Sequence, residues 1–261
     1  MELENLKSSL ATREFGKVIL LFQKIESTQA LALQMLKDPD SRHGTVIISL
    51  EQNSGVGRNG SKWISPLGGL WMSIIIRPSF KIENGLLLQF VAALAVQQAI
   101  ESLTGVDSTI KWPNDVMIKG KKVCGIIANA SYESATLTFA VVGVGVNVNF
   151  NDYLVNDKIK PKSYAKATSL LSELGHKLNL EVFAKLIIEK FEYYYLMLEQ
   201  NPVSILKNWK KHTDIIGREV VLIDGTNKIV GKAIDIQMDG GLLLETPNGQ
   251  FKVVSGSIYL P

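Results

Sequence analysis

Two short stretches of the sequence carry residues that could do chemistry on charged oxygen atoms. The first, GVGRNG (Gly55 to Gly60), matches the phosphate-binding pattern G-x-G-x-x-G and contains Arg58. A glycine-rich loop can bring backbone N–H groups close to an anion, and an arginine offers a fork of donors to phosphate or carboxylate. The second, KWPND (Lys111 to Asp115), presents a lysine and a carboxylate on either side of a rigid Trp-Pro turn. Together they predict a site for phosphate and acyl oxygens.

The glycine loop does not predict a dinucleotide-binding site. That fingerprint requires a helix directly after the loop and an acidic residue about 20 positions further on. The sequence continues instead with SKWISPLGG, in which Pro66, Gly68 and Gly69 would end such a helix at once. Kinase signatures are not found downstream either. We therefore expect a mobile loop between two strands, with Arg58 to bind an anion and Trp63 to cover a base or close the site.

Apolar runs predict the sheet and helices that must position these residues. A helix is expected to begin near Ser27 or Thr28, where a hydroxyl can cap the exposed N–H groups. The segment from Leu86 to Ile100 is apolar on most faces, carries three glutamines and is too short to span a bilayer, which indicates a helix buried in the core. A further helix is expected over 180–198, ended by Pro202. The expected strands are 18–22, 45–50, 70–78 and 136–150.

The KWPND motif is expected to lie on a β-hairpin. TIKWPNDVMIKGKKVCGIIANA predicts a strand, a Pro-Asn turn, a second strand, a tight turn at Lys119-Gly120 and a third strand. In that register Asp115 lies across from Cys124 and Gly125, with Lys122 nearby. Gly125 removes a side chain where another group could pass. Lysines 119 and 121 are left open between a solvated hairpin tip and a binding role.

The C-terminal segment has a different pattern from the rest of the chain. It holds four or five short strands separated by turns at Asp224-Gly225, Asp239 to Gly241 and Asn248-Gly249. This pattern predicts a small antiparallel barrel. We place the boundary near Thr213 to Gly217, which divides the chain into domains 1–213 and 214–261.

Composition narrows the function classes further. The 261 residues are 46% apolar with a net charge of +3, which predicts a folded core and does not indicate a nucleic-acid-binding surface. The single cysteine, Cys124, excludes an internal disulfide and is predicted to be a buried structural thiol. His43, His176 and His212 show no ligand spacing, so we expect no zinc site. The N-terminus does not look like a signal peptide, and we expect a cytoplasmic protein without membrane or nucleic-acid partners.

Taken together, these segments resemble the biotin protein ligase (biotin–[acetyl-CoA-carboxylase] ligase) family. The resemblance is carried by EST with Thr28, QNSGVGRNGSKWISPLGGLWMSI, KWPNDV, KKVCGII and VVGVGVNVN, in family order and at family-like spacing. It implies an α+β fold: a mixed, largely antiparallel sheet with flanking helices, similar to class II aminoacyl-tRNA synthetases, followed by an SH3-like barrel. Longer bifunctional members begin with a DNA-binding domain. This chain starts at the first core strand, so no DNA-binding role is expected.

The resemblance also implies an activity. Biotin and ATP give biotinyl-5′-AMP and pyrophosphate, and a lysine of a biotin carboxyl carrier domain then attacks the mixed anhydride and releases AMP. Mg²⁺ is the expected cofactor, with metal ligands unknown, and a homodimer is possible in this family. Two alternatives stay open: a lipoate or octanoate protein ligase, which shares the fold, and a non-catalytic biotin-binding protein.

Carried over to this sequence, the family motifs imply roles for individual residues. The biotin-binding set is Ser27, Thr28 and Gln52 on the fused rings, Arg58 and Lys122 on the carboxylate, and Gly125 beside the tail. The ATP- and adenylate-binding set is Gly57, Arg58, Trp63, Lys111 and Asn147, with Trp63 and Asn147 around the adenine. The catalytic set is Lys111, Arg58, Lys122 and Asp115. Lys111 would stabilise charge on the α-phosphate, and Asp115 would either orient the incoming lysine or help position a metal.

The sequence departs from the family pattern at four positions. The family loop usually reads G-R-G-R-x-G-R, and here Val56 and Ser61 replace the first and last arginines. Only Arg58 and Lys62 remain as nearby cations, which predicts weaker ATP binding or faster loss of the adenylate. Gln29 replaces the asparagine of the usual S-T-N, and Asn129 stands where many bacterial members have glutamate.

Overall fold

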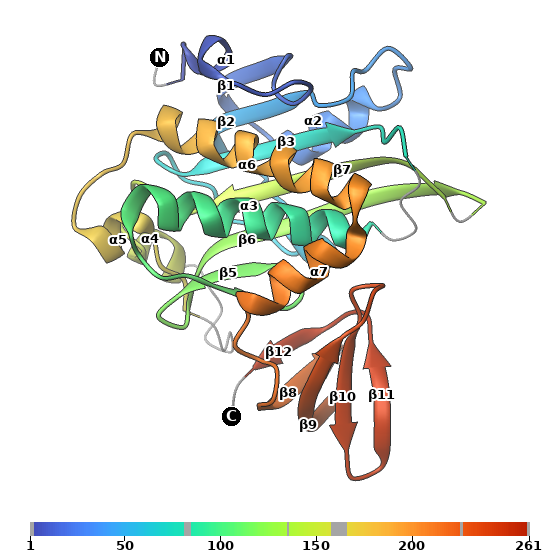
Figure 1. Cartoon of the computed structure of the whole chain (residues 1–261). Coiled ribbons are helices and arrows are strands. Elements are labelled where there is room, and N and C mark those ends of the chain that lie inside the picture. The colour runs from blue at the N-terminus through green and yellow to red at the C-terminus, as the bar shows by residue number, and fades with distance from the viewer. Residues whose placement is uncertain (1–2, 81–84, 135, 158–165, 225–226, 260–261) are drawn as a thin grey trace.

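A computed structural model describes residues 3–80, 85–134, 136–157, 166–224 and 227–259 of the chain (Figure 1). The larger part is built on a seven-stranded sheet in the order β1-β2-β3-β7-β6-β5-β4. Only β1 and β2 pair in parallel, and the other neighbours are antiparallel. The predicted mixed, largely antiparallel sheet is therefore confirmed. Its strands are β1 (Ile19–Ile25), β2 (Val46–Gln52), β3 (Leu70–Ile76), β4 (Thr109–Lys111), β5 (Asp115–Ile118), β6 (Lys121–Glu133) and β7 (Thr136–Val146).

Helices α3 (Leu86–Thr104) and α6 (Leu180–Gln200) cross one face of this sheet side by side (Figure 1). In the described part of the chain, α3 is the one helix long and apolar enough to cross a membrane, with a mean hydropathy of 1.5. However, 67% of that stretch is buried inside the fold. The prediction of a core helix is confirmed, because α3 packs between the sheet and α6.

Helix α6 ends at Gln200, close to the predicted end, but Pro202 does not simply terminate the helical region. It opens another helix, α7 (Pro202–Lys211), which the sequence analysis missed. Proline suits the first helical position, because the N–H that it lacks has no partner within the helix there. Trp209 of α7 is buried and stacks on Phe90 of α3, with ring centroids 4.7 Å apart. The two helices α6 and α7 thus cover α3 together.

The N-terminal segment, which includes α1 (Leu6–Ser9), is held against α6 by a buried carboxylate. Glu192 is 7% exposed, and its carboxylate accepts hydrogen bonds from the backbone N–H groups of Arg13 at 2.7 Å, Glu14 at 2.7 Å and Phe15 at 3.1 Å. Several charge-assisted bonds from consecutive amides offset the cost of burying this charge.

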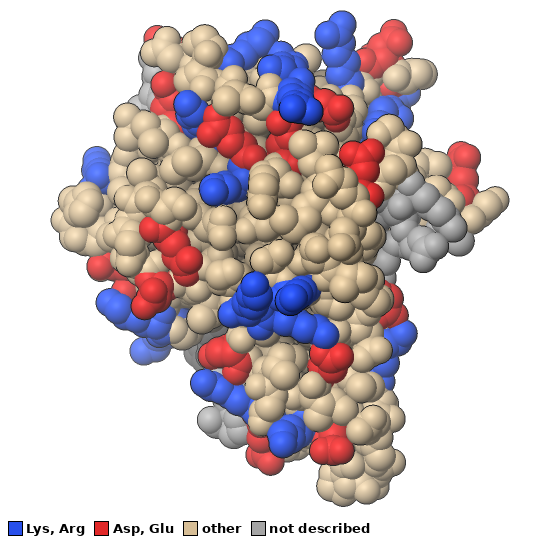
Figure 2. Space-filling view, viewed as in Figure 1, with Lys and Arg blue, Asp and Glu red and all other residues tan. Residues whose placement is uncertain are grey.

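Three short helices complete the larger part: α2 (Thr28–Met35), α4 (Tyr153–Asn156) and α5 (Leu170–Leu174). The predicted start of α2 is confirmed, because Ser27 caps it by accepting the Ala30 N–H at 3.3 Å. Acidic and basic side chains are interspersed over the face shown in Figure 2, with a basic group over α7. The end of α7 carries Lys210 and Lys211.

The C-terminal part is a five-stranded antiparallel sheet in the order β11-β10-β9-β8-β12, which fits the predicted SH3-like fold. Its strands are β8 (Glu219–Asp224), β9 (Asn227–Ile236), β10 (Leu242–Thr246), β11 (Gly249–Val253) and β12 (Ser257–Tyr259). The turn predicted at Asp239 to Gly241 lies between β9 and β10, and that predicted at Asn248-Gly249 lies one residue earlier, at Pro247-Asn248, with Gly249 opening β11. In the turn predicted at Asp224-Gly225, Gly225 lies outside the described residues.

Candidate active site

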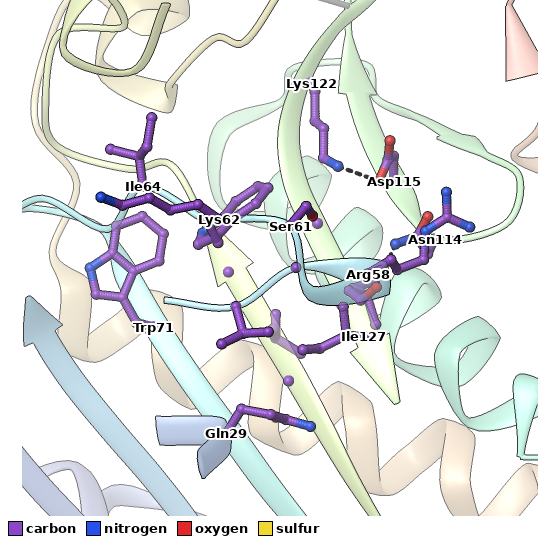
Figure 3. Close-up of a pocket in the computed structure, with 18 of the residues that line it drawn as sticks. Gln29, Arg58, Ser61, Lys62, Ile64, Trp71, Asn114, Asp115, Lys122 and Ile127 are labelled. Atoms are coloured by element: carbon purple, nitrogen blue, oxygen red, sulfur yellow. Dashed lines mark hydrogen bonds and ion pairs between the residues drawn. The ribbon is translucent and has the colours of Figure 1, made fainter. Parts of the chain in front are cut away.

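One cavity of about 520 Å³ gathers every residue that the sequence analysis assigned to the site. It lies between the glycine loop, the KWPND hairpin, the strands β3, β6 and β7, and the start of α2 (Figure 3). The predicted residues that line it are Ser27, Thr28, Gln52, Gly57, Arg58, Trp63, Lys111, Asp115, Lys122, Gly125 and Asn147. The sheet brings them together from segments more than a hundred residues apart.

One end of the cavity is a network of neutral polar side chains. Gln52 Oε1 accepts the Thr28 N–H at 2.8 Å and the Thr28 hydroxyl at 3.1 Å, and Gln52 Nε2 donates to Ser65 Oγ at 2.9 Å. Ser73 Oγ lies 2.9 Å from both Thr28 Oγ1 and Gln29 Oε1. These bonds fix the side chains in place, so this end presents oriented donors and acceptors without net charge.

Two of the departures from the family pattern meet at this polar end. Gln29 Nε2 donates to Asn129 Oδ1 at 2.9 Å and to the Val141 carbonyl at 3.1 Å. Gln29 is one of the residues that line the cavity (Figure 3). Ser73 was missed as a site residue, and its one signal in the sequence is a single hydroxyl within the apolar strand LWMSIII. Gln29 therefore lines the cavity, and the uncharged Asn129 supports it from behind through a hydrogen bond.

The other end of the cavity carries the charges. Asp115 pairs with Gly125 in the β5–β6 register, as predicted, and Lys122 Nζ lies 2.6 Å from Asp115 Oδ1 (Figure 3). The tight turn that sets this register has positive φ at Lys119 (48°) and Gly120 (73°), the backbone that a two-residue hairpin requires. The ion pair is partly buried, with side-chain exposures of 24% for Lys122 and 19% for Asp115.

Lys111 stands at the end of β4, opposite Asp115 in the register. Burial lowers the pKa of its ammonium group below the usual lysine range, Asp115 opposes that effect, and the neighbouring charges of Lys122 and Arg58 add to it. Three cations thus converge near one carboxylate. Like charges held this close repel one another, and a bound anion would relieve that repulsion, so the cluster is a candidate site for negatively charged oxygens.

Lysines 119 and 121 do not belong to the cavity. Both ammonium groups lie 3.1 Å from the carboxylate of Glu173 in α5, whose side chain is 5% exposed. Of the two alternatives the structure favours the solvated hairpin tip, with side-chain exposures of 71% for Lys119 and 41% for Lys121, and the ion pairs with Glu173 connect this tip to α5.

The glycine loop forms a short closed turn rather than the N-terminus of a helix. Val56 bridges Lys62 in an antiparallel pair, Gly57 N–H donates to the Ser61 carbonyl at 2.7 Å, and a 3-10 turn spans Arg58–Gly60. The rejection of a dinucleotide fingerprint is confirmed, because the chain after this turn leads into β3. Arg58 Nη2 donates to the Gly256 carbonyl at 3.0 Å, a contact with the C-terminal part that was not predicted.

Trp63 lies flat over the two glycines that the adjacent strands present to the cavity. A Cβ built on Gly125 would meet the indole at 2.8 Å, and one built on Gly145 would meet it at 2.6 Å. Lys122 Nζ lies 5.1 Å from the centre of the same ring. The space over Gly125, predicted to take the biotin tail, is thus occupied by Trp63 in this structure.

Asn147 offers an acceptor to the cavity. Its side chain is 2% exposed, and its Nδ2 donates to the Thr168 carbonyl at 2.9 Å, which fixes the amide. Its Oδ1 is buried without a hydrogen-bond partner. Because a buried carbonyl oxygen without a partner is costly, this atom is poised to accept a donor from a ligand.

The residues of the cavity fit a metal ion whose ligands come mostly from a bound nucleotide, and not one coordinated by several protein side chains. Asp115 is the one carboxylate among the described residues that line the cavity. Within the described part of the chain, no three His, Cys, Asp or Glu side chains gather in a metal-binding group. Mg²⁺ in nucleotide sites commonly takes one or two carboxylates, with phosphate oxygens and waters supplying the rest.

Comparisons with known proteins point to one family. The profile of the Biotin/lipoate A/B protein ligase family matches residues 21–147, and that of the Biotin protein ligase C terminal domain matches residues 215–260. The first match spans the polar end, the glycine loop and the hairpin. The second spans the C-terminal sheet.

Relatives and solved structures agree with these profiles. The bifunctional ligase/repressor BirA of Bacillus spizizenii is 32% identical over 98% of this chain and 78% of its own length. The biotin–[acetyl-CoA-carboxylase] ligase of Paracoccus denitrificans is 27% identical over 92% of this chain and 99% of its own. The biotin protein ligase of Aquifex aeolicus in complex with biotin and ATP superimposes with a TM-score of 0.74 at 29% identity, covering 93% of this chain and 98% of that one. These matches agree with the polar and charged ends of the cavity, and this chain is an enzyme that belongs to the biotin protein ligase family.

Proposed function

We propose that this protein attaches biotin to a lysine of a biotin carboxyl carrier domain, using ATP and forming biotinyl-5′-AMP as the intermediate. The observation that carries the proposal is the division of one cavity into a neutral polar end and a cationic end. A molecule with an uncharged ring system at one end and a carboxylate at the other matches that division. The relative from Aquifex aeolicus binds both biotin and ATP.

Biotin would enter with its fused rings toward Thr28 and Gln52 and its carboxylate toward Lys122 and Arg58. The ureido group has both N–H donors and a carbonyl acceptor, which the hydroxyls and amides of the polar end can satisfy. The valeryl tail would run over Gly125, so Trp63 must move from its position over that glycine. The indole then becomes available to cover the nucleotide.

ATP would place its α-phosphate beside Lys111 and Arg58. Bringing a carboxylate up to a triphosphate requires neutralisation of opposing negative charges, which the three cations supply. The carboxylate oxygen attacks the α-phosphorus and pyrophosphate leaves, and Lys111 stabilises the charge that develops on the phosphoryl oxygens. Asn147 Oδ1 would accept a hydrogen bond from the exocyclic amino group of adenine, which would give that buried oxygen a partner. Gly57, whose own N–H is bonded to the Ser61 carbonyl, would let the loop backbone approach the phosphates without a side chain in the way.

In the second step, a carrier lysine attacks the acyl carbon and AMP leaves. That lysine must be uncharged to be a nucleophile, so its ammonium group must give up a proton to a nearby acceptor. Asp115 fulfils this requirement, and its ion pair with Lys122 can open once Lys122 turns to the adenylate. Mg²⁺ bound to ATP would supply further charge neutralisation, with Asp115 and the phosphate oxygens as its ligands.

The finer organisation is also proposed. The domain boundary at residues 213 and 214 is supported by the two family profiles, which cover 21–147 and 215–260. A cytoplasmic location, a carrier domain as the one macromolecular partner and a homodimer are proposed from the family resemblance.

The test is incubation of the protein with biotin, Mg-ATP and a carrier domain, followed by intact mass measurement. A mass increase of one biotin on the carrier is the expected result. Substitution of lipoate for biotin separates the lipoate ligase alternative, and labelling by lipoate alone would overturn the proposal. Biotin binding without biotin-dependent pyrophosphate exchange would instead support the non-catalytic alternative.

A further inference from the structure

The last strand, β12, forms part of the active-site wall although it belongs to the C-terminal sheet. Ser257, Ile258 and Tyr259 line the cavity with residues of the larger part. β12 stands at the edge of its sheet, where β8 is its one neighbour among the described strands. A further contact fixes this placement, because the buried Trp112 Nε1 of the KWPND motif donates to the Gly240 carbonyl at 2.9 Å. The C-terminal part is therefore attached to the hairpin that carries the catalytic lysine.

The same strand contacts two of the three site cations. Arg58 Nη2 donates to the Gly256 carbonyl at 3.0 Å and lies 3.4 Å from Ser257 Oγ. Lys111 Nζ lies over the ring of Tyr259, 4.7 Å from its centroid. Long cationic side chains lose much conformational entropy when a ligand fixes them, so holding them beforehand favours the reaction. The two cations are held by residues about 150 to 200 positions further along the chain.

An aromatic ring is a suitable partner for Lys111 for a chemical reason. The ammonium is crowded by Lys122 and Arg58 and is partly buried, which disfavours its charged form. A ring face attracts a cation through its quadrupole but carries no net charge and takes no proton. It therefore stabilises the charged form without neutralising it. A carboxylate in the same place would compete with the phosphate for that charge.

We propose that Tyr259 is a positioning residue for the formation of biotinyl-5′-AMP, whose ring holds the Lys111 ammonium toward the α-phosphate. The role rests on the proposed function of this cavity. It also gives the C-terminal part a task in the first half-reaction, because Tyr259 of β12 holds Lys111, and Gly256, the residue just before β12, holds Arg58. The cationic end of the site is thus completed by a strand that lies outside the ligase sheet.

The first test compares Tyr259→Leu with Tyr259→Phe in biotin-dependent pyrophosphate–ATP exchange. We expect Tyr259→Leu to lower the kcat of exchange by on the order of tenfold, as for loss of a partly buried cation–π contact. Biotin affinity, measured by calorimetry, stays within about twofold of wild type because the polar end is untouched. Tyr259→Phe keeps the ring and is expected to retain wild-type kcat. Phe251→Leu, an aromatic of β11 remote from the cavity, controls for general loosening of the C-terminal sheet and leaves kcat unchanged.

The second test is a double-mutant cycle with Lys111→Ala. If Tyr259 acts through Lys111, Tyr259→Leu has no further effect on exchange once the lysine is absent. A full tenfold loss in both backgrounds, an equal loss in Tyr259→Phe, or an equal loss in Phe251→Leu would overturn the positioning role. Unaltered protein that shows no exchange refutes the proposed function and this role with it. Active wild type with an unimpaired Tyr259→Leu refutes the positioning role alone.

Discussion

Replacing Lys111 with alanine removes one positive charge from the place where the α-phosphate is expected. The side chain is partly buried, with Asp115 opposite in the register and Tyr259 against its ammonium. A unit charge about 4 Å from a phosphate oxygen contributes about 4 kcal/mol at an effective dielectric constant of about 20. Water that enters the cavity after the substitution solvates the phosphate and so recovers part of this interaction energy. We therefore expect a loss of about 2–4 kcal/mol in transition-state stabilisation, the range seen when one preorganised donor is removed.

The assay is single-turnover formation of biotinyl-5′-AMP at saturating biotin and ATP. The expected loss corresponds to a rate lower by about 30- to 1000-fold, while biotin affinity stays near wild type because the polar end does not involve Lys111. Lys121→Ala is the matched control, since this lysine lies on the same hairpin but contacts Glu173 at 3.1 Å. It should retain the wild-type rate. Equal losses of biotin affinity and of rate would refute the reasoning and make Lys111 a binding group.

The same lysine predicts a pH dependence. Burial lowers the pKa of Lys111, Asp115 and Asp214 act to raise it, and Lys122 and Arg58 act to lower it. Because the neutral amine cannot stabilise phosphoryl charge, adenylate formation should fall on the alkaline side at a pH below the usual lysine pKa. Lys111→Arg stays charged throughout that range, so any activity that it retains should lack this alkaline limb. An identical limb in both proteins would assign it to another group.

Three further substitutions test other parts of the structure. In Gly145→Ala the new Cβ would lie 2.6 Å from Trp63 Nε1, so we expect a loss of about 1–3 kcal/mol in unfolding free energy, measured by urea denaturation. Asn147→Ala removes the buried acceptor proposed for adenine, and should raise the KM for ATP about tenfold without changing biotin affinity in calorimetry. Glu192→Gln should lower the unfolding free energy by about 2 kcal/mol, because an amide cannot accept all the backbone N–H groups bound there. Glu189→Gln, whose bond to the N-terminal segment is exposed, should change it by less than about 0.5 kcal/mol.

Local features of the site could be predicted because neighbouring residues determine them. The register that brings Asp115 to Gly125 follows from one tight turn at Lys119-Gly120 and the alternation of the two strands. The start of α2 follows from the hydroxyl of Ser27. The absence of a helix directly after the glycine loop follows from Pro66, Gly68 and Gly69. In each case the deciding contact joins residues close together in the chain, so the pattern of residue types already contains it.

Other features depend on contacts that no local pattern contains. Gln29 and Asn129 are 100 positions apart, and only the packing of α2 against the sheet brings their side chains into hydrogen-bond contact. Helix α7 was missed because a proline after a helix is equally compatible with a loop and with the first residue of another helix. The burial of Trp209 against Phe90 favours the second helix.

The sequence by itself determined the family, the hairpin and the glycine loop, and it predicted most of the polar residues that line the cavity, because those residues lie in contiguous motifs. Only the tertiary structure decided what surrounds them: Trp63 over the two glycines, the unpartnered oxygen of Asn147, and β12 against Lys111 and Arg58. The physical reason is chain connectivity. The Arg58 to Gly256 contact spans 198 positions and carries no local signature, since a backbone carbonyl exists at every residue and only docking of the C-terminal sheet selects this one.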